Sequence, residues 1–283
     1  MYKIIDGKEL AAKMRIDLKK DVEAFSQKHG RHIGLAVVLA GDNPASQIYV
    51  KNKIKACEEV GIKSFAYYLS GDVSQEELEN LLRTLAEDKK INGILVQLPL
   101  PEHLDSEKAL KIIPDSKDVD GFSADNIGKL CQGKDSIVAC TPNGVMKMLE
   151  SCNVDLRGKK AVVVGRSNIV GKPMAMLLLN ADATVTICHS KTRNLKEECL
   201  GADVLVAAIG RAKFITADMV KQGAVVVDVG MNRDESGKLC GDVDFEAVKE
   251  KCSYITPVPG GVGPMTITML MYNTYLSATR SEI

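Results

Sequence analysis

The sequence predicts an α/β protein of two domains. Short apolar runs alternate with amphipathic helical patterns almost from end to end. The runs are nearly continuous in Val, Ile and Leu, which is typical of parallel sheets covered on both faces. The chain has 283 residues, 45% of them hydrophobic, and is long enough for two cores. A segment rich in Asp, Gly and Ser at 114–136 interrupts the alternation and marks the expected junction.

Three strands and three helices are expected in the first half. The apolar runs predict strands at 33–41, 64–70 and 92–100. The amphipathic patterns predict helices at 8–28, 46–60 and 74–88. Ser74 and Glu77 have the spacing of a capping box, which predicts the start of the third helix.

The second half repeats the alternation. Its apolar runs predict strands at 160–165, 184–190, 203–210 and 224–230. One helix is expected to have Thr141 as its cap and Pro142 as its first residue. The last helix is apolar enough to be buried, and we expect it to return to the first domain. The expected domains are therefore 1–138 joined by 266–283, and 139–265.

Composition excludes several classes of function. Lysine plus arginine and aspartate plus glutamate number 37 each, so no overall field draws the protein to nucleic acid or an acidic membrane. The eight cysteines form no CxxC pair and the four histidines no close ligand pattern, which predicts reduced thiols and no metal site. No apolar run approaches a membrane span, and the N-terminus is charged throughout, which predicts a cytoplasmic protein.

The helix predicted at 46–60 sets one lysine apart. At about 100° per residue, Val50 and Ile54 share an apolar face while Lys51 lies opposite. Lys53 falls at the margin of that face, one turn after Tyr49. Lysines at such a margin usually lay their methylenes on the core and keep the ammonium in water. The pattern alone therefore leaves a solvated and a chemical role open.

The segment VVVGRSNIVGKP at 162–173 predicts a phosphate-binding turn. It reads as a strand, a turn with Gly165 and Gly171, and a helix. Glycines let backbone amides approach a phosphate, and the helix N-terminus favours its charge. Ser167 stands where the GxGxxG pattern has its second glycine, so a plain βα turn remains an alternative.

The end of the next strand indicates which dinucleotide would bind. An NAD site usually has an acidic residue here that binds the ribose 2′-hydroxyl. Ser190, Lys191 and Thr192 occupy that place, and Arg166 in the preceding turn is a second candidate cation. Hydroxyls and cations suit a 2′-phosphate, which favours NADP. A polar surface turn is the alternative.

Three further stretches carry candidate site residues. Gln97 interrupts a buried run near its carboxyl end, where it either meets a ligand or is satisfied by a neighbouring loop. Asp118 and Asp120 precede a glycine, and both a turn and a site are open. The segment 256–266 alternates prolines and glycines, which indicates a stiff loop that lies against a planar ligand, with a mere linker as the alternative.

Eight segments together resemble a known family. They are YVKNKIKACEEVGI, GILVQLPLP, KDVDGF, CTPNG, GRSNIVGKP, HSKT, DVGMNR and PGGVGPMT. In this order, over essentially the whole chain, they closely resemble the bifunctional methylenetetrahydrofolate dehydrogenase/methenyltetrahydrofolate cyclohydrolase family. The resemblance implies an N-terminal α/β catalytic domain, a C-terminal NADP-binding Rossmann domain, and a cleft between them that holds the folate.

The resemblance also implies the activity. The protein would oxidise 5,10-methylenetetrahydrofolate with NADP and hydrolyse the methenyl product to 10-formyltetrahydrofolate. This is one-carbon metabolism that serves purine biosynthesis. The family further implies a cytoplasmic homodimer whose partners are tetrahydrofolate derivatives, with no nucleic acid or membrane.

The family's motifs assign roles to particular residues. Lys53 would be the catalytic lysine, Tyr49 would stack on the folate, Gln97 would support the lysine and Asp120 would hold the pterin. The implied substrate contacts add Val96, Leu98, Pro259, Gly260, Gly261, Val262 and Gly263. The implied cofactor contacts are Gly165, Arg166, Ser167, Ser190 and Met231.

The two reactions make different demands on the protein. Hydride leaves the methylene carbon with help from the adjacent nitrogen lone pair, so that step needs alignment more than an acid or base. Hydrolysis needs a group that exchanges protons near neutral pH. A lysine becomes such a group where desolvation and a cationic neighbour lower its pKa, and the methenyl substrate is a cation. We therefore expect Lys53 to serve mainly the hydrolysis.

Two other functions are weighed. A two-domain dehydrogenase of shikimate type would give no role to the combination of the Tyr49/Lys53 helix with the segments VQLPLP and PGGVGPMT. A non-catalytic NADP-binding sensor leaves Lys53, Gln97 and Asp120 together unexplained.

Overall fold

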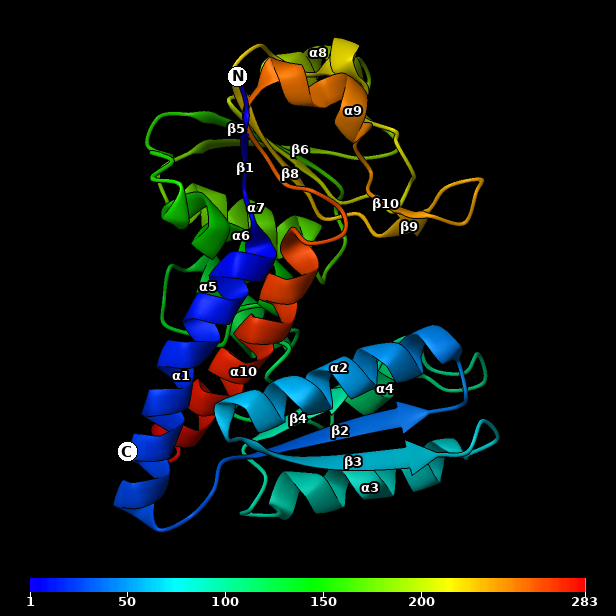
Figure 1. The fold of residues 1–283 in the computed structure, drawn as a ribbon. Helices are drawn as coiled ribbons and strands as arrows, with labels where there is room; N and C mark the ends of the chain where they lie inside the picture. The colour runs from blue at the N-terminus through cyan, green and yellow to red at the C-terminus, as the bar shows by residue number, and fades with distance from the viewer. Residues whose placement is uncertain (283) are drawn as a thin grey trace. The chain divides into compact units, whose positions relative to one another are not determined.

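A computed structural model describes residues 1–282 and divides into two compact units (Figure 1). The first, here called the six-stranded unit, comprises residues 1–12, 130–133 and 141–266. The second, the three-stranded unit, comprises residues 13–129, 134–140 and the segment from residue 267 onward. The expected domains, 1–138 with 266–283 and 139–265, remain a functional prediction. The compact units differ from them by placing residues 1–12, 130–133 and 266 with the six-stranded unit and residues 139–140 with the three-stranded unit.

The three-stranded unit is built on a parallel sheet of order β3-β2-β4. Its strands are β2 (Gly34–Ala40), β3 (Lys63–Leu69) and β4 (Gly93–Val96). They are connected by α2 (Pro44–Val60) and α3 (Gln75–Glu87), which cover opposite faces of the sheet (Figure 1). All of β2 is buried because its alternate residues face the two sides. Leu35, Val37 and Leu39 pack in the core that includes α2, whereas Ala36, Val38 and Ala40 pack in the core that includes α3.

Local signals fix the starts of both connecting helices. The Asn43 side chain accepts hydrogen bonds from the N–H groups of Ala45 and Ser46, so α2 begins at Pro44, two residues before the expected start. Ser74 and Glu77 form the predicted capping box at the start of α3.

The six-stranded unit is built on a second parallel sheet, of order β1-β11-β8-β7-β5-β6. The strands are β1 (Lys3–Ile4), β5 (Lys160–Val164), β6 (Thr184–Cys188), β7 (Val204–Ala207), β8 (Ala224–Asp228) and β11 (Cys252–Ile255). The chain runs outward from β5 to β6 and then returns to the other side of β5 as β7. This reversal is the topological switch point, beside which ligands of open α/β sheets bind at the carboxyl ends of the strands.

Helices and a hairpin complete this unit. The helices are α6 (Cys140–Ser151), α7 (Gly171–Asn180), α8 (Leu195–Leu200) and α9 (Phe245–Val248), with short 3₁₀ turns at Ala217–Met219 and Lys249–Lys251. A two-stranded antiparallel hairpin joins β9 (Asn232–Arg233) to β10 (Leu239–Cys240). The buried residues of β5, β7 and β8 form the core with those of α8 and α9.

Four more helices complete the described chain. They are α1 (Gly7–His29), α4 (Ser106–Leu110), α5 (Ala124–Cys131) and α10 (Val262–Arg280). Leu18, Val22 and Phe25 of α1 and Met269 to Met271 of α10 lie in the core of the three-stranded unit. The C-terminal helix is therefore buried, as its apolar sequence predicted.

Several predicted boundaries were wrong. The run at 92–100 forms a strand only to Val96, because Pro99 and Pro101 lack the N–H that a continuing ladder needs. Helix α6 begins at Cys140, so Thr141 is inside it, and the Thr141 hydroxyl pairs with that of Thr266 instead of capping the helix. Helix α10 begins at Val262, four residues before the expected start, and absorbs the end of the glycine-rich loop.

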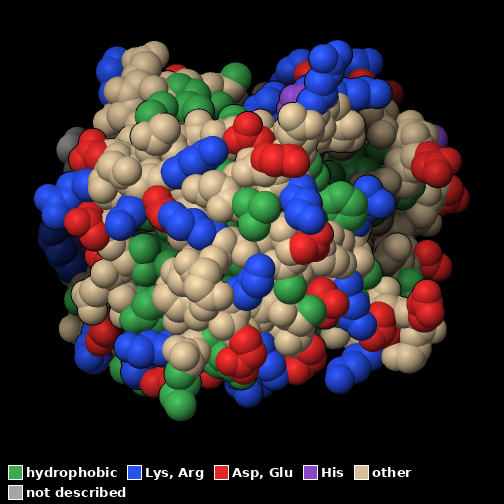
Figure 2. Space-filling view, turned by 90° about the horizontal axis from the view of Figure 1, so that it is seen from above, with side chains coloured by type: hydrophobic (Ala, Val, Ile, Leu, Met, Phe, Trp, Pro, Cys, Tyr) green, Lys and Arg blue, Asp and Glu red, His purple; other side chains and the backbone are tan. Residues whose placement is uncertain are grey.

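The surface and the thiols follow the composition. Basic and acidic side chains are interspersed over most of the face drawn in Figure 2, in keeping with a net charge of zero. All eight cysteines are free, and five of them are buried. Among residues 1–282, no helix is long and apolar enough to cross a membrane. Within the same range, no three His, Cys, Asp or Glu side chains gather as metal ligands would.

Candidate active site

Helix α2 directs one lysine toward the three-stranded unit, as its periodicity predicted. Lys51 and Lys55 are exposed, whereas Lys53 is partly buried. The Lys53 ammonium donates a hydrogen bond to Gln97, with Nζ and Oε1 3.0 Å apart. This hydrogen bond holds the Lys53 ammonium at one position, whereas the ammonium of a solvated lysine samples many positions.

Gln97 lies one residue beyond β4, at the carboxyl end of the sheet, with 9% of its surface exposed. Its N–H donates to the carbonyl of Val38 (2.8 Å) and extends the ladder by one bond. Its side-chain Nε2 donates to the carbonyl of Leu98 (2.7 Å), which turns Oε1 toward Lys53. The local backbone therefore satisfies one end of the amide and the lysine satisfies the other, and contact of Gln97 with a ligand stays a prediction.

Asp120 lies within electrostatic reach of the same lysine. Burial raises the pKa of Asp120 to about 6; the charge of Lys53 opposes this rise and that of Asp118 adds to it. Lys53, Gln97 and Asp120 therefore form one cluster, although they come from α2, the end of β4 and the segment between α4 and α5. A carboxyl that titrates near neutrality beside a fixed ammonium is typical of a functional site.

Asp118 shapes the turn that presents Asp120. Its carboxylate is 6% exposed and accepts hydrogen bonds from the N–H groups of Gly121 (3.1 Å) and Ser123 (2.7 Å) and from Asn126 Nδ2 (3.1 Å). Gly121 has φ +74°, and a Cβ there would come within 2.6 Å of the Val138 backbone. In the pair that the sequence left open, Asp118 therefore makes the turn and Asp120 interacts electrostatically with the lysine.

The sequence reasoning missed two supporting residues, Asn273 and Cys140. Asn273 of α10 is 1% exposed and donates from Nδ2 to the carbonyls of Val119 (2.9 Å) and Val138 (2.8 Å). Cys140 is buried and donates from its thiol to the Val119 carbonyl. Burial raises the pKa of this thiol well above its ordinary value, so it stays a neutral donor. The available signal was an asparagine inside an otherwise apolar helix, since a buried amide requires partners.

The other expected folate contacts in the three-stranded unit differ in how far they are exposed to solvent. Tyr49, one turn before Lys53, is 38% exposed, Val96 is 2% exposed at the end of β4, and Leu98 is partly buried. A flat, partly exposed ring one helical turn from Lys53 can reach a ligand that the lysine also reaches.

The loop that contains Pro259, Gly260, Gly261, Val262 and Gly263 belongs to the six-stranded unit. It is fixed to the start of α1, because the Lys8 N–H donates to the Gly260 carbonyl (3.0 Å). A Cβ at Gly7 would stand 1.9 Å from the Gly261 carbonyl oxygen, so only glycine allows this contact. The loop is anchored and not a loose linker, and its contact with folate stays a prediction.

The glycine turn after β5 has the close contacts that a phosphate loop requires. Gly165 has φ +132°, and a Cβ there would stand 2.2 Å from the Ala208 carbonyl oxygen. A Cβ at Gly171 would stand 2.3 Å from the Gly165 carbonyl oxygen, so the first turn of α7 packs against the loop. The Ser167 hydroxyl accepts from the N–H groups of Val170 (3.2 Å) and Gly171 (3.3 Å). The serine therefore tightens the turn at the place where other dinucleotide sites have glycine.

The end of β6 has the polarity expected for a 2′-phosphate site. Ser190, Lys191 and Arg166 are all exposed, and the segment after β6 has no acidic side chain before Asn194. The Thr192 hydroxyl accepts from the His189 N–H (2.8 Å), which fixes the turn that carries Ser190. Met231, after β8, is 45% exposed. The turns after β5, β6 and β8 thus supply glycine, hydroxyl, cationic and apolar groups that fit a phosphorylated dinucleotide.

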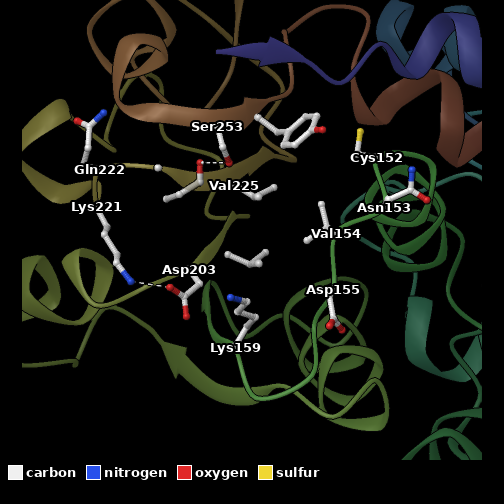
Figure 3. Close-up of a pocket in the computed structure, with 14 residues that line it drawn as sticks. Cys152, Asn153, Val154, Asp155, Lys159, Asp203, Lys221, Gln222, Val225 and Ser253 are labelled. Atoms are coloured by element: carbon white, nitrogen blue, oxygen red, sulfur yellow. Dashed lines mark hydrogen bonds and ion pairs between the residues drawn. The ribbon is translucent and has the colours of Figure 1, made fainter. Parts of the chain in front are cut away.

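One cavity of the six-stranded unit lies at the opposite end of its sheet (Figure 3). It encloses about 410 Å³, and its lining includes Lys159, Asp203 and Val225, at the amino ends of β5, β7 and β8. Asp203 is paired with Lys221 (2.5 Å), as Figure 3 shows. Because ligands of such sheets bind at the carboxyl ends, this cavity is separate from the cofactor turn.

The fold and these sites define a class of protein, an α/β dehydrogenase with a dinucleotide-binding sheet and a second α/β unit that carries a fixed lysine. Two family models identify the class further. Residues 5–120 match the tetrahydrofolate dehydrogenase/cyclohydrolase catalytic domain, and residues 139–282 match the tetrahydrofolate dehydrogenase/cyclohydrolase NAD(P)-binding domain.

Individual relatives agree with these matches. The chain is 57% identical over 281 residues to the bifunctional protein FolD of Streptococcus agalactiae, with 99% of each chain covered. It is similar to the crystal structure of the bifunctional FolD enzyme of Campylobacter jejuni, with a TM-score of 0.97, 53% identity, and coverage of 99% of this chain and 100% of that one. The dehydrogenase-cyclohydrolase of Trypanosoma brucei, solved with NADP and an inhibitor, is 38% identical, with a TM-score of 0.95 and coverage of 99% and 98%.

The chain therefore belongs to the tetrahydrofolate dehydrogenase/cyclohydrolase family. This confirms the predicted two-domain α/β fold, the NADP-dependent oxidation of methylenetetrahydrofolate and the hydrolysis of the methenyl product. The alternative of a shikimate-type enzyme is not favoured. A shikimate dehydrogenase of Thermus thermophilus is only 16% identical, with a TM-score of 0.54, which shows a shared fold and no more.

Proposed function

We propose that Lys53 is the residue that makes this protein a cyclohydrolase as well as a dehydrogenase. The observation that carries the proposal is the 3.0 Å hydrogen bond from Lys53 Nζ to Gln97 Oε1, beside a carboxyl whose pKa is about 6. In this assignment Tyr49 stacks on the folate, Gln97 holds the lysine and Asp120 holds the pterin. Val96, Leu98 and residues 259–263 complete the folate contacts.

The proposed role follows from proton chemistry. Water that attacks the methenyl carbon must lose a proton, and a ring nitrogen must gain one when the C–N bond breaks. An amine held in place by Gln97 can exchange both protons without a change of position.

We further propose that the cofactor binds at the carboxyl ends of the six-stranded sheet through Gly165, Arg166, Ser167, Ser190 and Met231. When bound, NADP supplies the hydride acceptor. The chain's own groups supply binding and alignment. The Gly165 turn leaves room for phosphate against the backbone, Ser190 and Arg166 offer a hydroxyl and a cation to the 2′-phosphate, and Met231 offers an apolar surface.

The experiment is Lys53→Met, which keeps the length of the side chain and removes the amine. NADP reduction with methylenetetrahydrofolate and hydrolysis of added methenyltetrahydrofolate are assayed separately. We expect hydrolysis to fall by about 10²- to 10⁴-fold, the usual contribution of a proton-transfer group, while NADP reduction persists. Lys51→Met, an exposed lysine two residues earlier, is the matched control. Intact hydrolysis in Lys53→Met would sink the idea.

The cellular setting is proposed on the family alone. We propose a cytoplasmic homodimer whose 10-formyltetrahydrofolate feeds purine biosynthesis. Its partners would be tetrahydrofolate derivatives, with no nucleic acid or membrane. The zero net charge supports the exclusion of nucleic acid.

A further inference from the structure

Two buried aspartates of the six-stranded unit have no part in the chemistry described above. Asp228 is the last residue of β8 and is 3% exposed, and Asp242 follows β10 and is 0% exposed. In the described part of the chain, the donors to both carboxylates are backbone N–H groups and the Asn232 amide, with no lysine or arginine side chain. A buried carboxylate without a cation is costly unless N–H groups solvate it, so its presence calls for a reason.

Asp242 is solvated entirely by two loops at the carboxyl end of the sheet. Its Oδ2 accepts from the N–H groups of Ile209 (2.6 Å) and Gly210 (3.1 Å), directly after β7. Its Oδ1 accepts from the Arg211 N–H (2.8 Å) and from Asn232 Nδ2 (2.9 Å). Four donors thus converge on one carboxylate, three from the loop after β7 and one from the segment after β8.

Asp228 fixes the position of Asp242. Its Oδ1 accepts from the N–H groups of Asp242 and Gly230, both at 2.9 Å, and its Oδ2 accepts from the Val243 N–H (2.9 Å). Asp228 therefore fixes the backbone at Asp242, and the Asp242 side chain in turn fixes the two loops.

Two glycines make this arrangement possible. A Cβ at Gly241 would stand 1.8 Å from Asp228 Oδ2, and a Cβ at Gly230 would stand 2.3 Å from Asp242 Oδ1. No other residue fits at either position without displacing a carboxylate. The backbone at Gly241 and Gly230 therefore packs directly against the carboxylates of Asp228 and Asp242.

The loops held in this way border the proposed cofactor site. The loop after β7 begins at Ala208, the residue against which the Gly165 turn packs. Met231 lies between Gly230, whose N–H is bound by Asp228, and Asn232, whose side chain is bound by Asp242. The chain is therefore anchored on both sides of the proposed cofactor contact, although Met231 itself is 45% exposed.

We propose that Asp242, held by Asp228, is a positioning residue for the dinucleotide, because it fixes the loops after β7 and β8 in the conformation that receives it. This proposal rests on the assignment of NADP to this end of the sheet. The carboxylates act through backbone groups and do not touch the cofactor.

The test is Asp242→Asn. An NH₂ in place of Oδ2 would face the N–H groups of Ile209 and Gly210. An NH₂ in place of Oδ1 would face the Arg211 N–H, because the Asn232 amide can turn to accept from it, so at least one hydrogen bond becomes a repulsive contact in either case. We expect the Kd for NADPH, measured by fluorescence titration without folate, to rise at least about tenfold, since bonds to a charged group are lost. The KM for NADP should rise similarly, whereas hydrolysis of added methenyltetrahydrofolate should stay within about twofold, because Lys53 and Gln97 lie in the other unit.

Asp203→Asn is the matched control. Asp203 precedes β7 at its amino end, where it accepts from the Lys160 N–H (3.0 Å) and pairs with Lys221 (Figure 3). Its amide variant should leave the affinity for NADPH unchanged. Unaltered NADPH affinity in Asp242→Asn, or an equal loss in Asp203→Asn, overturns the proposal.

A milder variant decides the matter if Asp242→Asn does not fold. Asn232→Ala removes one of the four donors from a partly exposed position, and we expect NADPH affinity to fall about threefold. Unchanged affinity in that variant overturns the proposal. Unchanged NADPH affinity in Gly165→Ala would instead refute the assignment of the cofactor to this end of the sheet, so the two failures are distinguishable.

Discussion

Replacing Gln97 by leucine tests how much the hydrogen bond that holds Lys53 contributes to hydrolysis, because the lysine itself is left in place. Gln97→Leu keeps a similar volume at a position that is 9% exposed but removes the oxygen that accepts from Lys53 Nζ at 3.0 Å. A hydrogen bond to a charged group contributes about 1.5 to 3 kcal/mol. If that energy holds the amine in its reactive position, hydrolysis should fall about 10- to 150-fold, at 1.36 kcal/mol per tenfold change in rate.

The assay follows the loss of methenyltetrahydrofolate absorbance in the absence of NADP. NADP reduction with methylenetetrahydrofolate is measured in parallel and should persist, which also shows that the variant is folded. Gln222→Leu, an exposed glutamine of the six-stranded unit labelled in Figure 3, is the control. Hydrolysis within about twofold of the wild-type rate would refute the reasoning, because the bond would then contribute less than the smallest value used above.

Three further predictions concern the cofactor turn, its selectivity and the pH dependence. Gly165→Ala should weaken NADPH binding at least about tenfold, because its Cβ would meet the Ala208 carbonyl at a φ of +132°; fluorescence titration measures this, and unchanged affinity would contradict it. Ser190→Asp should erode or reverse the preference for NADP over NAD, since a carboxylate repels a 2′-phosphate and accepts from a 2′-hydroxyl; an unchanged ratio of kcat/KM values would exclude Ser190 as a contact. Burial raises the pKa of Asp120 to about 6, so the carboxylate that would hold the pterin is lost as pH falls through that value. The KM for folate should then rise about tenfold between pH 7 and 5, whereas Asp120→Asn should show a flat profile.

The parts of the site that follow from local periodicity could be predicted. The facing of Lys53 depends only on the 3.6-residue repeat of α2, and the structure buries Val50 and exposes Lys51 as that repeat requires. Gln97 was recognisable because a polar residue in a buried run needs a partner. The start of α3 directly after its cap Ser74 was equally local, since capping depends on four consecutive residues.

The parts that depend on distant partners could not be predicted. Asn273 donates a hydrogen bond to the carbonyl of Val119, 154 residues away. Nothing in the sequence around Asn273 indicates that partner. Asp242 likewise lies in a short loop segment that gives no hint of the turn after β7, which supplies three of its donors. Composition and periodicity predict which residues of a segment are buried, but they do not predict which other segment packs against those residues.

The short strands show the same limit. Strand β1 has two residues and β11 has four, and both join the sheet through parallel pairing with strands distant in sequence. Runs of this length carry too little alternation to be told from loop. Thr141 shows the converse error, because a residue with strong capping preference lies inside α6 when its hydroxyl has another partner, here Thr266.

The proposed role of Lys53 is to act on the one-carbon unit during hydrolysis. The most direct measurement is a crystal structure of the protein with a methenyltetrahydrofolate analogue bound. We expect Lys53 Nζ within about 2.6 to 3.2 Å of the one-carbon group or of a water beside it, with the bond to Gln97 retained. A structure in which Lys53 points away from that carbon, with no water between them, would contradict it.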